Sequence, residues 1–99
     1  MKPDLDIVVP VYNEEENFET LYRHLSLLVQ SVWRMTVVYD FPEDTTLMVA
    51  RPLAEKDQRI RLLRNDKRGV LSAITTGFRD ATAPQTLTLM MDNHTEING

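Results

Sequence analysis

The sequence predicts an α/β fold, namely a partial doubly wound, mostly parallel sheet with the element order βαβαβαβ. Apolar, β-branched runs of strand length alternate along the chain with amphipathic stretches of helical period. Polar, turn-forming residues separate these runs. No internal repeat, low-complexity tract or Gly/Ser linker divides the 99 residues, so we expect at most one domain.

The first strand and the first helix have the clearest pattern. Residues 5–11 form an almost unbroken apolar run, which is typical of a parallel strand covered by helices on both faces. The strand should end at Pro10, because proline has no N–H for the ladder. Asn13 is a favourable helix cap, and the three glutamates after it suit a first turn. Apolar residues at helical spacing then predict a helix over about 14–32.

The second half of the alternation is built from shorter elements. Strands are expected over residues 35–39, 60–63 and 86–91. A second helix should begin near residue 46, with Asp44 or Thr45 as its cap. Pro52 should kink or break this helix, because its ring removes one internal hydrogen bond.

A third helix is expected over about 70–81, with apolar residues that include Leu71 and Phe78 on one side. The fourth strand, 86–91, should be a central strand because both of its faces carry apolar side chains, yet no fifth strand follows to cover its edge. An exposed apolar edge favours pairing with another chain, so self-association is expected. Residues 92–99 are polar and are expected to fray.

Composition excludes several classes of protein. The chain has no cysteine, which rules out a disulfide scaffold and fits a reducing compartment such as the cytoplasm. Its formal net charge of −4 argues against a nucleic-acid partner. No apolar run approaches the ~20 residues of a membrane-spanning helix. Phosphate-binding glycine motifs of the Rossmann and P-loop types are absent from the sequence.

Polar residues follow all four predicted strands. In a doubly wound sheet, ligands bind beyond the carboxyl ends of the strands, where the strand order reverses. This rule gathers four segments around one crevice: 12–14, 40–44, 65–69 and 92–94. The sequence therefore places its polar residues where this fold would put a site.

Two of these segments offer groups that suit a nucleoside. Tyr12 presents a flat ring on which a base can stack, and the amides that open the first helix can bind an anion. The alternative is a capped helix with a packed tyrosine. Asp40 can accept a hydrogen bond from a base or a ribose hydroxyl, or it can simply terminate its strand.

The other two segments offer groups that suit a diphosphate and a metal ion. Lys67 and Arg68, with Arg64, bring positive charge to the crevice and can hold a diphosphate. The alternative is a solvated loop of mixed charge. Asp92 and His94 are spaced so that both can reach one divalent ion, Mg²⁺ or Mn²⁺, or else they belong to an ordinary turn.

Taken together, the segments resemble the amino-terminal half of a family 2 glycosyltransferase of the GT-A, Rossmann-like fold, close to dolichol-phosphate-mannose synthases. Residues 6–15 are similar to the opening strand and loop of that family. Residues 37–46 resemble its second strand and acidic loop, with Asp40 on the second aspartate of that loop. Lys67, Arg68 and Gly69, with Ala73 and Gly77 downstream, are similar to its glycine- and alanine-spaced helix, Gly-x-x-x-Ala-x-x-x-Gly.

The resemblance implies roles for individual residues. Pro10, Tyr12 and Glu14 would contact the base and ribose of a nucleotide sugar, and Asp40 would bond the base. Lys67 or Arg68 would approach the diphosphate. Asp92 would be the first carboxylate of the metal-binding Asp-x-Asp motif, with His94 in the place of the second. An alternative register puts Asn93 and Glu96 at acidic positions of the motif.

The whole of residues 1–99 is thus expected to be the nucleotide-sugar-binding half of a truncated glycosyltransferase domain. Its donor would be a UDP- or GDP-linked sugar, and its acceptor a polyprenyl phosphate or a glycan. The acceptor half and the catalytic base would lie beyond this region, so we do not expect the chain alone to catalyse transfer. A membrane anchor beyond it would place the protein at the cytoplasmic membrane face. The alternative is a degenerate, non-catalytic nucleotide-binding or interaction module.

Overall fold

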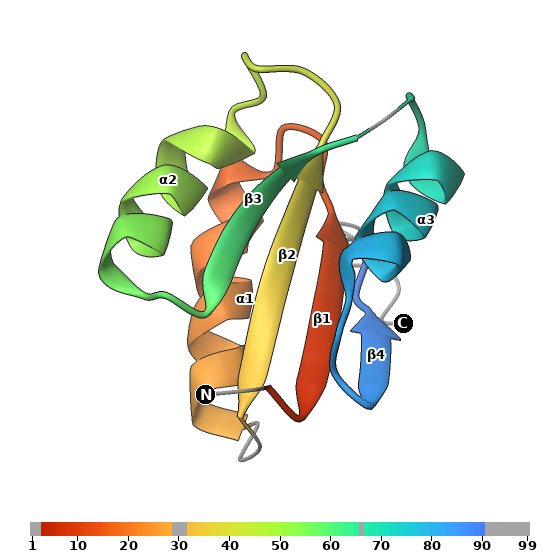
Figure 1. The fold of residues 1–99 in the computed structure, drawn as a ribbon. Helices are drawn as coiled ribbons and strands as arrows, with labels where there is room; N and C mark the ends of the chain where they lie inside the picture. Colours follow the sequence, from red (N-terminus) through yellow and green to blue (C-terminus); the bar gives the residue numbers. More distant parts are fainter. Residues whose placement is uncertain (1–2, 29–31, 66, 91–99) are drawn as a thin grey trace, which may run out of the picture.

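The computed structural model describes residues 3–28, 32–65 and 67–90, and it confirms the alternating order of strands and helices (Figure 1). The elements in chain order are β1 (Leu5–Pro10), α1 (Glu15–Leu28), β2 (Trp33–Tyr39), α2 (Thr46–Lys56), β3 (Ile60–Arg64), α3 (Val70–Asp80) and β4 (Gln85–Thr88).

The described strands form one parallel sheet in the order β3-β2-β1-β4. The chain moves outward from β1 to β2 and β3, and then returns to the other side of β1 with β4 (Figure 1). Strand order therefore reverses at the boundary between β1 and β4. In sheets of this kind, that boundary is the expected place for a ligand.

One face of the sheet packs against α1 and α2 and is almost entirely apolar. Side chains alternate between the faces of a strand, so every second residue of β1 and β2 points to this side. The buried cluster on this face consists of Ile7, Val9, Val11, Phe18, Leu25, Trp33, Met35, Val37, Ala50 and Ile60. Burial of these side chains is the main source of apolar stabilisation in the described fold.

The opposite face packs against α3 through small residues. Its buried apolar cluster is limited to Val8, Val38 and Ala73. A Cβ atom built at Gly77 would lie 2.3 Å from Cγ1 of Val8, so the glycine lets α3 approach β1 closely. The apolar side predicted for this helix is not its buried side, because Leu71 is 78% exposed and Phe78 is 47% exposed.

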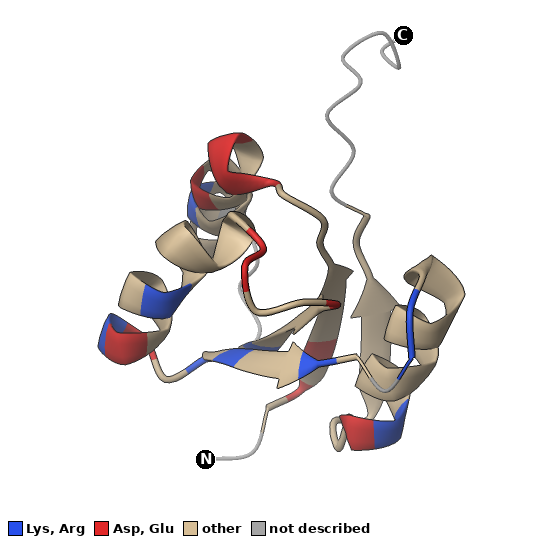
Figure 2. Ribbon diagram, turned by 90° about the horizontal axis from the view of Figure 1, so that it is seen from above, with Lys and Arg blue, Asp and Glu red and all other residues tan. Residues whose placement is uncertain are grey.

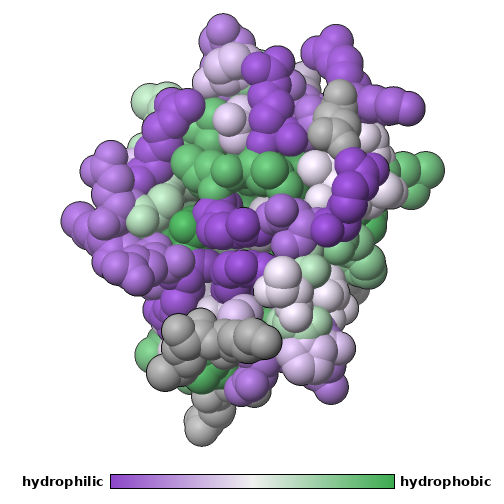
Figure 3. All heavy atoms as spheres, viewed as in Figure 1, coloured by the Kyte–Doolittle hydropathy of each residue, from purple (hydrophilic) through white to green (hydrophobic). Residues whose placement is uncertain are grey.

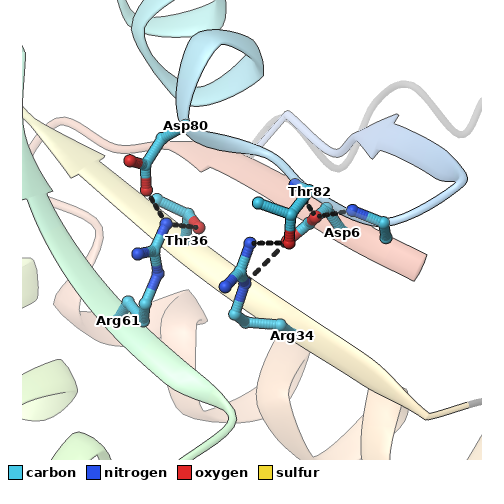
Figure 4. Close-up of polar contacts among 7 residues, drawn as sticks. Asp6, Arg34, Thr36, Arg61, Asp80 and Thr82 are labelled. Atoms are coloured by element: carbon cyan, nitrogen blue, oxygen red, sulfur yellow. Dashed lines mark hydrogen bonds and ion pairs between the residues drawn. The ribbon is translucent and has the colours of Figure 1, made fainter. Parts of the chain in front are cut away.

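The rest of the α3 face carries charged residues near the amino ends of the strands (Figure 4). Asp6 accepts a hydrogen bond of 2.8 Å from Nε of Arg34 and two more, also of 2.8 Å, from the backbone N–H groups of Thr82 and Ala83. Burial alone would raise the pKa of Asp6, but Arg34 and these N–H groups outweigh it and hold the pKa below its ordinary value.

A second ion pair on the same face joins β3 to the end of α3. Arg61 pairs with Asp80 and donates to the hydroxyl of Thr36 at 3.3 Å. Burial lowers the pKa of Arg61, and the like charge of Arg34 lowers it further. Around these groups, the face seen in Figure 1 is largely hydrophilic and surrounds an apolar area (Figure 3).

The amino end of the sheet also carries a polar cluster on the α1 side. The guanidinium of Arg59 lies 4.0 Å from the ring centroid of Trp33. It also donates to both oxygens of Asp57, which accepts a further hydrogen bond of 2.6 Å from the hydroxyl of Tyr22. Hydrogen bonding by Arg59 holds the pKa of Asp57 well below its ordinary value.

Three predicted boundaries need correction. The first helix is described only to Leu28, and Val32 precedes β2, where its carbonyl accepts N–H groups from residues 4 and 5. β2 begins two residues early, at Trp33, because that indole belongs to the core. Of the kink or break predicted at Pro52, the break is absent, since α2 continues to Lys56. Pro52 is exposed, so a carbonyl left without its partner there can bond to water.

β4 spans Gln85–Thr88 and so ends earlier than the predicted strand over 86–91, and it lies at the edge of the described sheet. The N–H of Leu89 bonds to the carbonyl of Val8, and β4 is parallel to β1. Parallel geometry then directs the backbone groups of Thr88 away from β1. Residues 81–91 contain no charged side chain, so this edge lacks the charges that commonly prevent pairing with other chains.

Candidate functional site

A cavity of about 370 Å³ lies at the carboxyl ends of the strands, where the strand order reverses. Four of the predicted site residues line it: Pro10, Tyr12, Glu14 and Asp40. The remaining lining residues are Val11, Gly69, Val70, Ala73 and Met90. β1, β2, α3 and the segment after β4 thus converge on one space, as the doubly wound topology predicts. We call this space the first cavity.

The loop after β1 is fixed by the loop after β2. The backbone N–H of Asn13 donates to Oδ1 of Asp44 at 3.0 Å, and the side-chain oxygen of Asn13 accepts the N–H of Thr45 at 3.0 Å. The N–H of Glu14 donates to the hydroxyl of Thr46 at 2.7 Å. These reciprocal bonds determine where Tyr12 and Glu14 lie.

The predicted capping role of Asn13 is therefore wrong. Asn13 has a positive φ of 50°, and α1 starts only at Glu15. Its side chain bonds to the loop before α2 instead of to the first turn of α1. Asp44 does accept the N–H of Thr46 at the start of α2, at 2.8 Å, but it also holds Asn13 and so connects two loops.

Tyr12 is an exposed aromatic side chain at the rim of the first cavity. It is 66% exposed, and its ring meets Phe41 edge to face with a centroid separation of 5.8 Å. The alternative of a packed tyrosine does not describe this position. An exposed ring in contact with a second ring offers a flat apolar surface at the rim of the first cavity.

Asp40, at the end of β2, is held by neutral donors. Its Oδ1 accepts the amide N–H of Asn65 at 2.7 Å, and its Oδ2 accepts the backbone N–H of Gly69 at 3.2 Å. A carboxylate has about four lone-pair sites, so further donors can still reach Asp40. Asp40 lies on the wall of the first cavity, so this acceptor borders that space.

Lys67 and Arg68 lie on a neighbouring space and not on the first cavity. This second cavity, of about 320 Å³, is lined by Asp40, Phe41, Arg64, Asn65, Lys67 and Arg68. Asp40 belongs to both cavities, so the predicted basic residues adjoin the predicted base-binding residues. Viewed from above, acidic residues lie on the start of α1 and the loop after β2, and basic residues lie on the segment before α3 (Figure 2).

The predicted metal ligands, Asp92 and His94, lie outside the described residues. Within residues 3–28, 32–65 and 67–90, no group of three or more His, Asp or Glu side chains is placed to hold a metal ion. No helix in the described part of the chain is long and apolar enough to cross a membrane.

Asn65 belongs to the segment 65–69 that the sequence places at the crevice, but the sequence assigned it no role of its own. It is only 5% exposed, and its amide contacts the end of β2, the loop before α3 and α3 itself. In the sequence it is one polar residue in a polar loop, and the partners of its side chain are 2 to 25 residues away. The one available signal was its position directly after β3, at the carboxyl edge of the sheet.

Comparison with known proteins agrees with this architecture. The family model described as Glycosyl transferase family 2 matches residues 6–99, which include every element of the described fold except the first residue of β1. The chain belongs to glycosyl transferase family 2. Its parallel sheet with alternating helices is consistent with part of the GT-A, Rossmann-like fold.

This family 2 member is also similar to a dolichol-phosphate mannosyltransferase of Pyrococcus furiosus. The two sequences are 31% identical over 78 residues, which make up 78% of this chain and 22% of the relative. The chain therefore spans about a fifth of the length of that relative.

Proposed function

We propose that this family 2 member binds the nucleoside diphosphate part of a nucleotide-sugar donor at the carboxyl edge of its sheet. The observation that carries the proposal is the first cavity, which brings Pro10, Tyr12, Glu14 and Asp40 together from separate loops. In this arrangement the base stacks near Tyr12, while Glu14 and Asp40 accept hydrogen bonds from the base and ribose.

The chemistry of Asp40 favours some bases over others. An ionised carboxylate can only accept hydrogen bonds. Uracil and guanine present a ring N–H donor on their pairing edges, whereas cytosine and adenine present a ring-nitrogen acceptor at the equivalent position. UDP- and GDP-linked sugars are therefore the proposed donors, and CDP and ADP are matched controls.

The diphosphate would lie toward the second cavity, which adjoins the first at Asp40. Lys67 and Arg68 are exposed there and precede α3. Arginine binds phosphate through two parallel N–H groups, and lysine binds it as a compact charge. Their placement supports a diphosphate beside a nucleoside in the first cavity.

For the acceptor, the relative's name supports a polyprenyl phosphate, and a glycan is the other acceptor we propose. Mg²⁺ or Mn²⁺ remains the proposed cofactor, with Asp92 and His94 as its proposed ligands. When bound, such an ion would stabilise the negative charge on the leaving diphosphate.

Isothermal titration calorimetry with UDP, GDP, CDP and ADP tests the donor proposal directly. We expect saturable binding of UDP or GDP, at least about tenfold tighter than binding of CDP or ADP, because a mismatched base would set its ring-nitrogen acceptor against the carboxylate of Asp40. A parallel series with Mn²⁺ tests the cofactor. No binding of UDP or GDP, with or without Mn²⁺, would contradict the proposal and favour a non-catalytic interaction module.

We also propose self-association through the edge of β4. Leu87 and Met90 are exposed there, the backbone of Thr88 points away from β1, and residues 81–91 are uncharged. A second copy can add its own β4 to this edge by backbone hydrogen bonds. Light scattering over a range of protein concentrations measures this association.

A further inference from the structure

We infer that Asn65 is a positioning residue that joins the base end of the proposed donor site to its diphosphate end. The inference rests on the proposed function and adds a residue to it. Asn65 does not line the first cavity, where the nucleoside is proposed to bind. It acts through the two groups it holds, the carboxylate of Asp40 and the loop that carries Lys67 and Arg68.

The orientation of the Asn65 amide is determined by its surroundings. On its nitrogen side, Nδ2 donates to Oδ1 of Asp40 at 2.7 Å and to the carbonyl of Gly69 at 3.1 Å. On its oxygen side, Oδ1 accepts the hydroxyls of Ser72 at 2.8 Å and Thr76 at 3.2 Å. A flipped amide would place its oxygen against two acceptors and its nitrogen against the hydroxyls, so one orientation is strongly preferred.

These bonds close a ring of contacts around the loop before α3. Gly69 donates its N–H to Asp40 and gives its carbonyl to Asn65, while its φ of +95° turns the chain. The backbone N–H of Lys67 also points to Oδ1 of Asn65, at 3.4 Å. Because Asn65 is buried, its own amide is shielded from competing water. A displacement of the amide would therefore move Asp40 and the basic loop together.

The substitution Asn65→Asp tests this role with a readout that a general packing defect would not give. It keeps the shape of the side chain but turns the donor side into an acceptor that faces Oδ1 of Asp40. Two carboxylates at hydrogen-bond distance share one proton at low pH and repel each other once both are ionised. The defect should therefore grow as the pH rises.

Other charged groups surround this pair and must be controlled. Arg64, Lys67 and Arg68 line the second cavity beside Asp40, and Glu14 lines the first cavity. Asp66 lies outside the described residues. The double substitution Asp40→Asn/Asn65→Asp keeps all of these groups but leaves a single carboxylate in the pair, so it isolates the effect of the pair itself.

The experiment titrates UDP and GDP by calorimetry and follows urea unfolding of the same proteins. For Asn65→Asp we expect affinity to fall by about tenfold or more near pH 8 and to recover toward that of the wild type near pH 5.5. Its stability should fall over the same interval, and the double substitution should remove this fall. Circular dichroism at both pH values confirms that each variant is folded.

Ser72→Ala provides a second test in case Asn65→Asp does not fold. It removes one of the bonds that orient the amide, so we expect about threefold weaker nucleotide binding. Thr75→Ala is the matched control, because its exposed hydroxyl bonds to Leu71 within the same helix and should leave binding unchanged.

The outcomes separate the two proposals. If the wild type binds and Asn65→Asp binds equally well at both pH values, or loses the same affinity at both, the role of Asn65 is overturned while the donor site stands. If Asn65→Asp is unfolded, equal binding by Ser72→Ala and Thr75→Ala overturns it in the same way. If the wild type binds neither nucleotide, the donor site fails and this role of Asn65 fails with it.

Discussion

Helix α3 is attached to the sheet by polar groups at both of its ends, and the two ends use different chemistry. At the amino end of the sheet, the buried carboxylate of Asp6 pairs with Arg34 of β2 and accepts the backbone N–H groups of Thr82 and Ala83, which follow α3. At the carboxyl end, Asp40 accepts hydrogen bonds from the neutral amide of Asn65 and from the backbone N–H of Gly69.

The difference separates a structural role from a binding role. A carboxylate paired with arginine has its charge balanced inside the protein, so it has little to offer a ligand. A carboxylate held by neutral donors is not used up in an ion pair and has spare lone pairs, and Asp40 carries such a group on the wall of a cavity. The amino end therefore stabilises the fold, and the carboxyl end is organised to bind.

The largest expected effect comes from breaking the amino end. In Asp6→Asn, one carboxylate oxygen becomes an NH2 group. Whichever way the new amide is turned, this donor faces either Arg34 or the N–H groups of Thr82 and Ala83. We expect the free energy of unfolding to fall by about 3 kcal/mol, because the partners remain buried without an acceptor. Urea unfolding measures the loss.

Asp4→Asn is the matched control for this change, since Asp4 is exposed and lies two residues earlier. It should stay within about 0.5 kcal/mol of the wild type. Equal stability of the Asp6 and Asp4 variants would contradict the structural role of the amino end.

A smaller effect is expected where α3 lies closest to the sheet, between the two ends. The Cβ of Gly77→Ala would overlap Val8, so we expect a loss of about 2 kcal/mol in the free energy of unfolding. Gly69→Ala meets nothing within 4 Å and is strained only by its φ of +95°. It should cost about 1 to 3 kcal/mol, because a φ of +95° with a ψ of 163° is adopted almost only by glycine. If urea unfolding places Gly77→Ala within about 0.5 kcal/mol of the wild type, the close packing of α3 on β1 is wrong.

Acid should weaken the amino end in particular. The pKa values of Asp6 and Asp57 are lowered in the folded protein, so each carboxylate adds stability above its unfolded pKa. That stability is lost as the pH falls below the unfolded value, with a slope of at most about 1.4 kcal/mol per pH unit for each group. Urea unfolding between about pH 6 and pH 2 should show a shallower decline in Asp6→Asn than in the wild type.

A substitution at the edge of β4 should have the smallest effect on stability but a clear effect on self-association. Leu87→Lys places a charge on this edge and should lower self-association while changing the free energy of unfolding by less than about 1 kcal/mol. Leu27→Lys, at an exposed position of α1, is the matched control. If light scattering shows the same mass for both variants at every concentration, β4 is not the surface of association.

The order of strands and helices could be predicted from the sequence, because the spacing of apolar residues and the positions of turn residues are local properties of the chain. The sequence also located the first cavity, since parallel strands deliver their carboxyl ends to one edge. It failed where a distant partner overrides a local rule. Asn13 is a residue type that commonly caps helices, but its side-chain oxygen accepts a hydrogen bond from the backbone N–H of Thr45 in another loop. Likewise, α3 buries Ala73 and Gly77 because only small residues fit against Val8.

The most direct test of the contrast between the two ends is a calorimetric titration of UDP and GDP into the wild type, Asp40→Ala and Asp6→Asn under conditions where all three are folded. We expect the wild type and Asp6→Asn to bind one of these nucleotides with similar affinity, and Asp40→Ala to bind it at least about tenfold more weakly. Equal binding by the wild type and Asp40→Ala would contradict the assignment of the carboxyl end as the donor site.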